Sequence, residues 1–356
     1  MILREAQAAD WPEVAEFVLA TPLESGTSFV LDRRPDFGAL PALRGRFRTF
    51  LVYQQRRLAG TVTALWHPAR DRDHTITLGE IIDLRVAPWA RGGRTTFHLL
   101  RATQEVFVSE RVDWMTCLVG DRNRAVIPAL EGRAGLPPFA PLEHFASVHF
   151  VAARLPRVPV SPQVAVRAAT ASDAGLLAAL CAAEHATQRF APTEPLPWPD
   201  TSGRHRAWIA LSPNGTPYGA LVTWDGEPAR RLRVMKYRLA DWPLRIAIGV
   251  AARARLSNRL PGPGEVLRLW ATRLIAVTRD DSGTLAALVH AALTAAVADG
   301  QNVLQVNLSG RDPLFRRLPR YPRSSFWSTL YGCPCNARIS SVQETISRYH
   351  ADIARV

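Results

Sequence analysis

The chain carries an internal repeat, and this repeat is the feature that most restricts how it can fold. Leu3-Arg-Glu-Ala-Gln-Ala-Ala-Asp10 aligns with Val166-Arg-Ala-Ala-Thr-Ala-Ser-Asp173 at an offset of 163 residues. Four of the eight positions are identical: Arg4/Arg167, Ala6/Ala169, Ala8/Ala171 and Asp10/Asp173. Each segment predicts a strand, then an aspartate at a helix N-cap, then a helix. One face of each helix is apolar: Val14, Phe17 and Val18 in the first, and Leu177, Leu180 and Cys181 in the second.

The same order of elements continues along both copies. Each segment predicts a hairpin, a central strand, a long helix and a further strand. In the first copy these are 50–53 with 58–66, then 81–86, 95–108 and 114–119. In the second they are 207–211 with 218–224, then 269–277, 284–298 and 303–308.

The repeat therefore predicts two tandem domains of one mixed α/β fold. Each has a twisted mixed central sheet flanked by helices. The domains are expected at residues 1–155 and 163–356, joined by the proline-rich segment 156–162. The second copy has roughly 26 more residues, which predicts an inserted helical segment at about 226–265.

Composition excludes several other classes of protein. The 356 residues include 47% hydrophobic and 21% charged residues, which is typical of a globular chain and long enough for two domains. No apolar run reaches the ~18–20 residues of a membrane-spanning helix. The first ten residues carry charges where a signal peptide is apolar, so we expect a cytoplasmic protein.

The net charge of +13 favours anionic partners, among them phosphate-bearing cofactors. Lys236 is the single lysine among 44 basic residues, so arginine supplies the rest. No metal is expected, because Cys333 and Cys335 have no second Cys or His pair at zinc-ligand spacing. Cys117 and Cys181 lie in apolar stretches and are interpreted as core residues.

The segment Ile82–Leu100 is the most informative for function. Its pattern predicts a strand, then a basic loop with Gly92 and Gly93, then a helix that starts at Thr95 or Thr96. Exposed amides at a helix N-terminus form an anion site, and glycines let the backbone approach a ligand closely. Arg91 and Arg94 add cations suited to phosphate. A solvated loop before a helix explains the same residues equally well.

This segment resembles the GNAT superfamily of CoA-dependent N-acyltransferases. Val86-Ala-Pro88, Arg91 and Leu99-Leu100 match its strand end, loop start and helix end, whereas Arg94 and Thr96 replace the usual glycines. The order of elements resembles the family once per copy, and residues 128–136 resemble its helix-turn ending in Gly-Phe. The resemblance implies an acyl-CoA donor, acetyl-CoA or another, with its pyrophosphate on the loop. The implied cofactor-binding residues are Leu84, Arg85, Val86, Arg91, Gly92, Gly93, Arg94, Thr95 and Thr96.

Three residues are implied for catalysis by the same resemblance. Glu80 stands where some members carry the base, and strict alternation would place Glu80, Ile82, Leu84 and Val86 on one face. Asn123 resembles an asparagine near the pantetheine arm, and helix capping explains it as well. The family's frequent acid is a tyrosine on the next helix, which here has Glu131 or a water in its place.

The second copy is predicted to bind CoA poorly. Its loop carries Asp280 and Asp281, which repel a pyrophosphate. Its insertion includes Trp242–Leu256, whose apolar residues and arginines predict a basic amphipathic helix. Packing between the domains is the simplest interpretation of that helix; membrane-surface binding and a lid over an acyl substrate are the others.

The predicted function is transfer of an acetyl or other acyl group from CoA to an amine of a small molecule or peptide. The first alternative is a catalytically degenerate module that binds CoA or a partner without turnover. The second is a basic nucleic-acid-binding protein, which the lack of interleaved aromatic and basic stretches disfavours. The acceptor, the acyl chain length and the oligomeric state are not predicted.

Overall fold

The computed structural model describes residues 1–21, 28–133, 137–154, 164–227, 229–278, 282–335 and 348–351. Residues up to 154 form β1 (Ile2–Glu5), α1 (Trp11–Ala20), β2 (Ser28–Asp32), α2 (Ala39–Ala42), β3 (Arg46–Gln54), β4 (Arg57–Asp71), β5 (His74–Val86), α3 (Thr95–Ser109), β6 (Trp114–Gly120) and β7 (Ala140–Val151). Later residues form β8 (Ala165–Ala168), α4 (Ala174–Ala186), β9 (Gln188–Arg189), β10 (Ala191–Pro192), β11 (His205–Leu211), β12 (Pro217–Asp225), β13 (Arg231–Lys236), α5 (Trp242–Arg253), β14 (Val266–Leu267), β15 (Leu269–Val277), α6 (Ser282–Ala298), β16 (Val303–Ser309), α7 (Pro313–Arg317), β17 (Arg323–Pro334) and β18 (Arg348–Tyr349). In this part of the chain no helix has both the length and the apolar character needed to cross a membrane.

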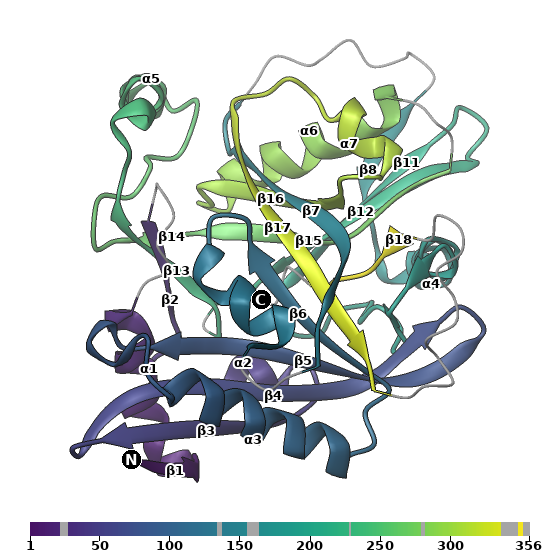
Figure 1. Cartoon of the computed structure of the whole chain (residues 1–356). Coiled ribbons are helices and arrows are strands. Elements are labelled where there is room, and N and C mark those ends of the chain that lie inside the picture. The colour runs from purple at the N-terminus through teal and green to yellow at the C-terminus, as the bar shows by residue number, and fades with distance from the viewer. Residues whose placement is uncertain are drawn as a thin grey trace.

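One mixed sheet of 13 strands runs through the whole molecule (Figure 1). Its order is β1-β3-β4-β5-β6-β17-β7-β16-β15-β12-β11-β8, and β10 pairs with β4 off this path. The predicted hairpins, central strands and long helices of both copies are present as β3–β4, β11–β12, β5, β15, α3 and α6. The predicted mixed α/β class is therefore confirmed.

The two copies exchange strands at the centre of this sheet. Strand β17, from the second copy, pairs with β6 of the first along Ser328–Pro334. Strand β7, from the first copy, pairs with β16 of the second along Phe145–Val151. Because β17 and β7 also pair with each other, the two sheets are joined by backbone hydrogen bonds into one.

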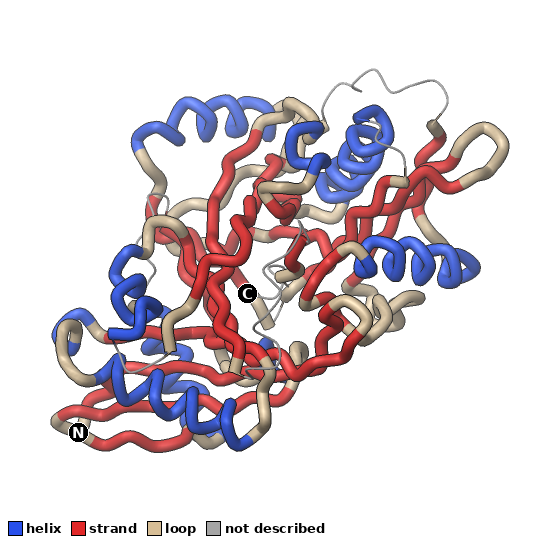
Figure 2. The backbone as a smooth tube through the Cα atoms, turned by 45° about the vertical axis from the view of Figure 1, so that its right-hand side comes forward, coloured by secondary structure: helices blue, strands red, loops and turns tan. Residues whose placement is uncertain are grey.

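Helices cover both faces of the sheet (Figure 2). Neighbouring residues Leu51 and Val52 of β3 belong to different cores, as the alternation of a strand requires. Leu51 packs with α1, and Val52 belongs to the core under α3. In the second copy α4 packs on one face and α6 on the other.

The residues that are identical between the repeats make the same ion pair. The Arg4 guanidinium donates two hydrogen bonds of 2.7 Å to Asp10, and Arg167 donates two of 2.7 Å to Asp173. Each aspartate also accepts from the backbone amide three residues earlier. Each aspartate is the N-cap residue of its helix, as predicted, but its side chain ties a turn to the preceding strand and makes no hydrogen bond to the helix amides.

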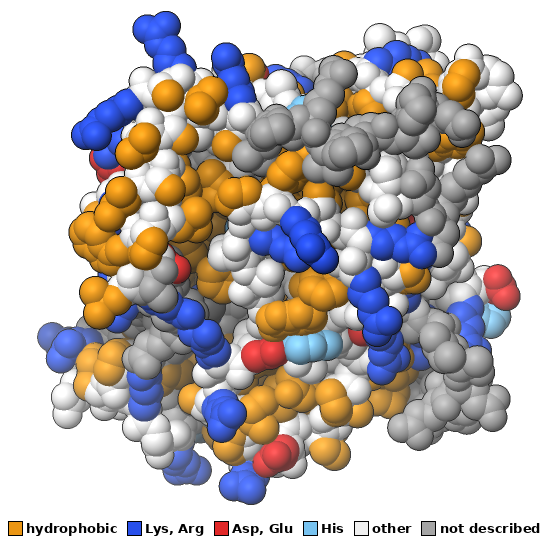
Figure 3. Space-filling view, turned by 90° about the horizontal axis from the view of Figure 1, so that it is seen from above, with side chains coloured by type: hydrophobic (Ala, Val, Ile, Leu, Met, Phe, Trp, Pro, Cys, Tyr) orange, Lys and Arg blue, Asp and Glu red, His pale blue; other side chains and the backbone are white. Residues whose placement is uncertain are grey.

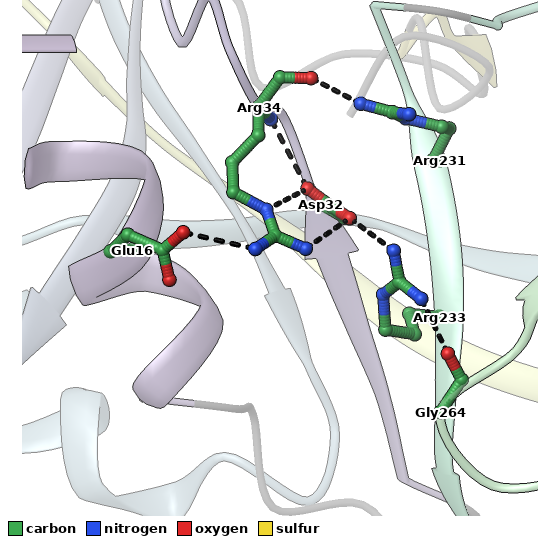
Figure 4. A network of polar contacts seen from close by, with 6 residues as sticks. All are labelled: Glu16, Asp32, Arg34, Arg231, Arg233 and Gly264. Carbon is green, nitrogen blue, oxygen red and sulfur yellow. Dashed lines mark hydrogen bonds and ion pairs between the residues drawn. The ribbon is translucent and has the colours of Figure 1, made fainter. Parts of the chain in front are cut away.

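The insertion of the second copy is attached to the first copy. Its strand β13 pairs antiparallel with β2, and together with β14 they form a separate three-stranded sheet. Asp32, at the end of β2, accepts hydrogen bonds from Arg34 at 3.0 Å and from Arg233 of β13 at 2.7 Å (Figure 4). These arginines hold the pKa of the buried Asp32 carboxyl well below its usual range, although its burial opposes them.

Candidate functional site

The central strands of the first copy separate part-way along their length. Strand β5 pairs in parallel with β6 only from Leu78 to Glu80, opposite Trp114 to Thr116. Beyond Glu80 and Thr116 both strands continue, to Val86 and Gly120, without pairing with each other. The splay between them exposes strand edges whose amides and carbonyls can bind an extended ligand.

A β-bulge lies in β5 within this splay. Thr63 of β4 pairs with Ile82, and Thr61 pairs with Arg85, so β5 has one extra residue there. Asp83 adopts a φ of 56°, in the left-handed region that aspartate tolerates better than most residues. The bulge puts Arg85 on the face of Glu80 and Ile82, and turns Leu84 and Val86 to the opposite face. The expected strict alternation from Glu80 to Val86 was therefore wrong.

The bulge is fixed by a buried ion pair. Arg33 donates hydrogen bonds of 2.6 and 2.8 Å to the two carboxylate oxygens of Asp83, and both side chains are almost fully buried. Arg85 is next to this pair, and its burial lowers the pKa of its guanidinium although the Asp83 charge raises it. The described residues provide no partner for the buried Nε of Arg85.

The loop after β5 leads into the N-terminus of α3. Arg91, Gly92, Gly93 and Arg94 are all exposed, and Gly92 has a φ of 77°. Arg94 is the N-cap of α3, and its side chain does not cap the helix. In the described part of the chain, the amides of Gly92, Gly93, Thr95 and Thr96 have no hydrogen-bond acceptor.

These groups meet the requirements of an anion site. Unpaired amides at the start of a 15-residue helix attract negative charge, and two exposed arginines flank them. The start of α3 packs closely against the sheet at Gly60 of β4. A side chain added at Gly60 would clash, because its Cβ atom would lie only 2.9 Å from the Thr95 Cγ2 atom. Gln54 holds Thr95 by a 2.8 Å hydrogen bond, so the Thr95 hydroxyl is already engaged by the protein.

Glu80 lies where the splay begins, between two basic side chains. Its carboxylate accepts a hydrogen bond of 2.5 Å from Arg44, which is 2% exposed, and one of 2.9 Å from His67 Nε2. His67 Nδ1 lies 3.1 Å from the Pro68 carbonyl oxygen, which can only accept. With Glu80 ionised, both ring nitrogens donate, and His67 is an imidazolium.

The pKa of His67 is raised above its ordinary 6.5. Its burial lowers the pKa, but the hydrogen bond and charge of Glu80 together outweigh the burial. Glu80 is therefore a carboxylate held between two cations, with His67 as its titrating partner.

Asn123 and Glu131 line a cavity of about 650 Å³ at the end of β6, which we call the β6 cavity. Tyr331 and Thr329 of β17 complete it, although they belong to the second copy. Tyr331 pairs with Cys117, one residue beyond the last β5–β6 pair. Glu80 does not line this cavity, so the structure brings together two of the three predicted catalytic residues and leaves the third at the start of the splay.

Cys117 and Cys181 are core residues, as predicted. Burial, with a further contribution from the Glu80 charge, raises the pKa of the Cys117 thiol to about 12. A thiol with this pKa is protonated at neutral pH and is a poor nucleophile. Among the residues that the structure describes, no three His, Cys, Asp or Glu side chains come together as a metal site.

The central strands of the second copy also separate, but they carry no carboxylate at the position of Glu80. Strand β15 pairs with β16 only up to Ala271, opposite Gln305, and carries a one-residue bulge between Thr272 and Leu274. Ala271 therefore takes the position of Glu80. Next to this splay is a small cavity of about 80 Å³, partly lined by Arg348–Ala351. Arg348 pairs there with Glu184 and Asp312. Asp280 and Asp281 lie outside the described residues.

Several site residues were missed from the sequence. Arg44 lies 36 residues before Glu80, and nothing in its sequence neighbourhood marks it. His67 follows from the register of the β4–β5 hairpin, where Leu65 pairs with Glu80, so alternation places His67 on the same face. Tyr331 reaches the β6 cavity only through the strand exchange.

Comparison with known proteins agrees with this geometry. No family model matches the chain, and no curated protein matches its sequence. Saccharomyces cerevisiae N-myristoyltransferase with bound myristoyl-CoA superposes with a TM-score of 0.57 and 11% identity, over 94% of this chain and 78% of that one. A GCN5-related N-acetyltransferase from Anabaena variabilis superposes with a TM-score of 0.51 and 8% identity, over 94% and 73%. The chain has the GNAT fold.

Proposed function

We propose that this protein transfers an acyl group from an acyl-CoA to an amine, and that residues 1–155 bind the acyl-CoA whereas residues 163–356 do not. The single observation that carries the proposal is the splay of β5 from β6, which leads directly to the open amides and two arginines at the start of α3. The second splay has no carboxylate at the position of Glu80. The fold that the chain shares with N-acyltransferases supports the same reaction.

The proposed donor is held by two sets of groups. The amides of Gly92, Gly93, Thr95 and Thr96, together with Arg91 and Arg94, bind the pyrophosphate. The unpaired edge of β5 beyond Glu80 binds the amide groups of the pantetheine arm, as a strand edge binds an extended peptide. We take acetyl-CoA as the first donor to test, and longer acyl-CoAs as the second.

The chain offers a proton acceptor and a proton donor near the splay. Glu80 and His67 together accept the amine proton once His67 has released its own proton to solvent, as it does when the pH rises through its raised pKa, because neutral His67 then provides a basic site next to the carboxylate. Tyr331 lines the β6 cavity with Asn123 and Glu131, and we propose its hydroxyl as the donor to the leaving thiolate. This role replaces the expected tyrosine of the helix after β6 with one from the second copy.

Titration calorimetry with CoA tests the donor site. Arg91→Ala combined with Arg94→Ala should weaken CoA binding ~100-fold, because each charge-assisted hydrogen bond contributes ~1.5–3 kcal/mol. Arg101→Ala is the matched control: it removes an exposed arginine of the same helix, two turns from its start, that pairs with Glu105. Equal binding by both variants, or two CoA molecules per chain, would contradict the proposal.

One observation favours a second candidate, a protein that binds acyl-CoA without turnover. A carboxylate between Arg44 and protonated His67 is a weak base. Turnover assays with a panel of amines separate the two candidates. Catalysis predicts CoA release that falls ~10²-fold or more in Glu80→Gln, with CoA binding unchanged. If the protein binds acyl-CoA but no amine in the panel causes release of CoA, it binds acyl-CoA without turnover.

A further inference from the structure

Helix α5 and the turn before it display an uncovered apolar surface. Leu239, Trp242, Ile246 and Val250, which we call the α5 stripe, are 87%, 50%, 63% and 59% exposed. Trp242, Ile246 and Val250 are spaced by four residues and so lie along one side of the helix. Ile248 lies on the opposite side and is the helix's one buried residue. The outer side of α5 is therefore not covered by the rest of the described chain, contrary to the expected packing of this helix between the domains.

The concentration of exposed apolar residues here is high for this chain. Half of the exposed large hydrophobic residues that the structure describes, six of twelve, lie within residues 235–256. The other six are distributed over α3, two loops and the N-terminus. Apolar side chains gather on the left of the molecule, the side on which α5 lies in Figure 1, with Lys and Arg side chains around them (Figure 3). Large exposed apolar surfaces with a polar rim mark interaction sites.

The rim of the α5 stripe is cationic. Residues 235–256 contain five basic residues and one acidic residue, Asp241, a net charge of 5 − 1 = +4. The basic residues are Lys236, Arg238, Arg245, Arg253 and Arg255. The Arg245 guanidinium lies 4.1 Å from the Tyr237 ring centre and 5.2 Å from that of Trp242, so its charge stays beside the stripe. A partner for this surface must be both apolar and anionic.

The strands that carry α5 are bonded to the rest of the molecule. The helix lies between β13 and β14, and β13 is fixed to β2 by paired backbone and by Asp32. The Tyr237 hydroxyl donates a 2.7 Å hydrogen bond to the Pro261 carbonyl, which closes the base of the insertion. The first copy has no counterpart of this segment, so the shared fold does not require it.

We propose that α5 docks this protein on an anionic lipid surface, with the stripe entering the headgroup boundary and the basic rim contacting lipid phosphates. The stripe lies on a single helix that projects from the rest of the chain (Figure 1), and an open helix face suits a fluid surface better than a ligand that fills a groove. A tryptophan, branched aliphatic residues and flanking arginines are typical of helices that lie in the membrane interface. This inference does not depend on the proposed acyl transfer.

Co-sedimentation of the full chain with vesicles tests the proposal. One set of vesicles is phosphatidylcholine alone, and the other contains phosphatidylglycerol as well. We expect about tenfold more binding to the anionic set, and a loss of that binding at about 0.5 M salt, where charges are screened. Ile246→Glu combined with Val250→Glu should abolish binding without affecting folding, since both side chains are exposed.

Val108→Glu is the matched control, because Val108 is 71% exposed on α3, away from the insertion. It should bind vesicles like the wild type. Absence of vesicle binding by the wild type, or equal loss in Val108→Glu, would overturn the proposal. So would a dimer in sedimentation equilibrium that Ile246→Glu dissociates, because the stripe would then bind a second copy. Binding of an acidic protein without vesicle binding would also overturn it.

Discussion

At the scale of single residues, His67 and Glu80 make the fold sensitive to pH. The folded pKa of His67 is raised above 6.5, so its protonated form stabilises the native state. This stabilisation is complete below pH 6.5 and is lost as the pH rises through the raised pKa. His67→Gln should therefore lower the thermal midpoint most at acidic pH, and the difference from wild type should shrink as the pH rises through the raised pKa of His67. A difference that does not vary with pH would contradict the assignment of an imidazolium.

The two repeated ion pairs offer a matched comparison. In Asp10→Asn and Asp173→Asn we expect a loss of about 1 kcal/mol each, because partly exposed pairs are screened by solvent. Arg4 and the local amide lower the pKa of Asp10 to about 2, so its contribution is full above pH 3.8 and is lost as the pH falls through 2. Urea unfolding of both variants measures the losses. Very different losses at neutral pH would argue against equal roles in the two copies.

At the scale of elements, sequence patterns predict those strands, turns and helices that neighbouring residues determine. The hairpins, the long helices and the start of α3 at Thr95 follow from alternation, turn residues and helical spacing. The bulge at Asp83 could not be predicted, because an aspartate in a strand does not show that its φ is positive. That one residue changes which face carries Arg85, Leu84 and Val86. Sequence reasoning therefore predicted the strand itself correctly, and was wrong about which face of it carries these side chains.

The bulge should depend on the buried pair between Arg33 and Asp83. Asp83→Ala leaves the Arg33 charge buried without its partner and puts alanine in a left-handed conformation. We expect a loss of about 3–5 kcal/mol in unfolding free energy. Asp83→Asn should lose less, since asparagine tolerates this conformation and its oxygen still accepts from Arg33. Urea denaturation of both variants checks the order, and a loss below about 1 kcal/mol in Asp83→Ala would show that the pair does not hold the bulge.

At the scale of the whole molecule, the repeat predicts two units but does not reveal how they are joined. Both copies carry a complete order of elements, which is compatible with two independent sheets. The exchange of β17 and β7 depends on which of two similar edges each strand meets, and no local pattern encodes that choice. It has a structural consequence, since it brings Tyr331 to the cavity that contains Asn123 and Glu131.

Because the two copies exchange strands, we expect that cutting the chain between residues 155 and 163 destabilises both fragments. Fragment 1–155 would keep β7 but lose β17, which lies between β6 and β7 and pairs with both. Fragment 163–356 would lose β7 from the edge of β16. A buried ion pair, in which Arg189 donates to Asp71 at 2.6 and 2.7 Å, would also be divided. We expect neither fragment to unfold cooperatively on its own, and a mixture of both to recover a single transition. Calorimetry of each fragment and of the mixture measures this, and a cooperative transition of 1–155 alone would mean that the exchanged strand is dispensable.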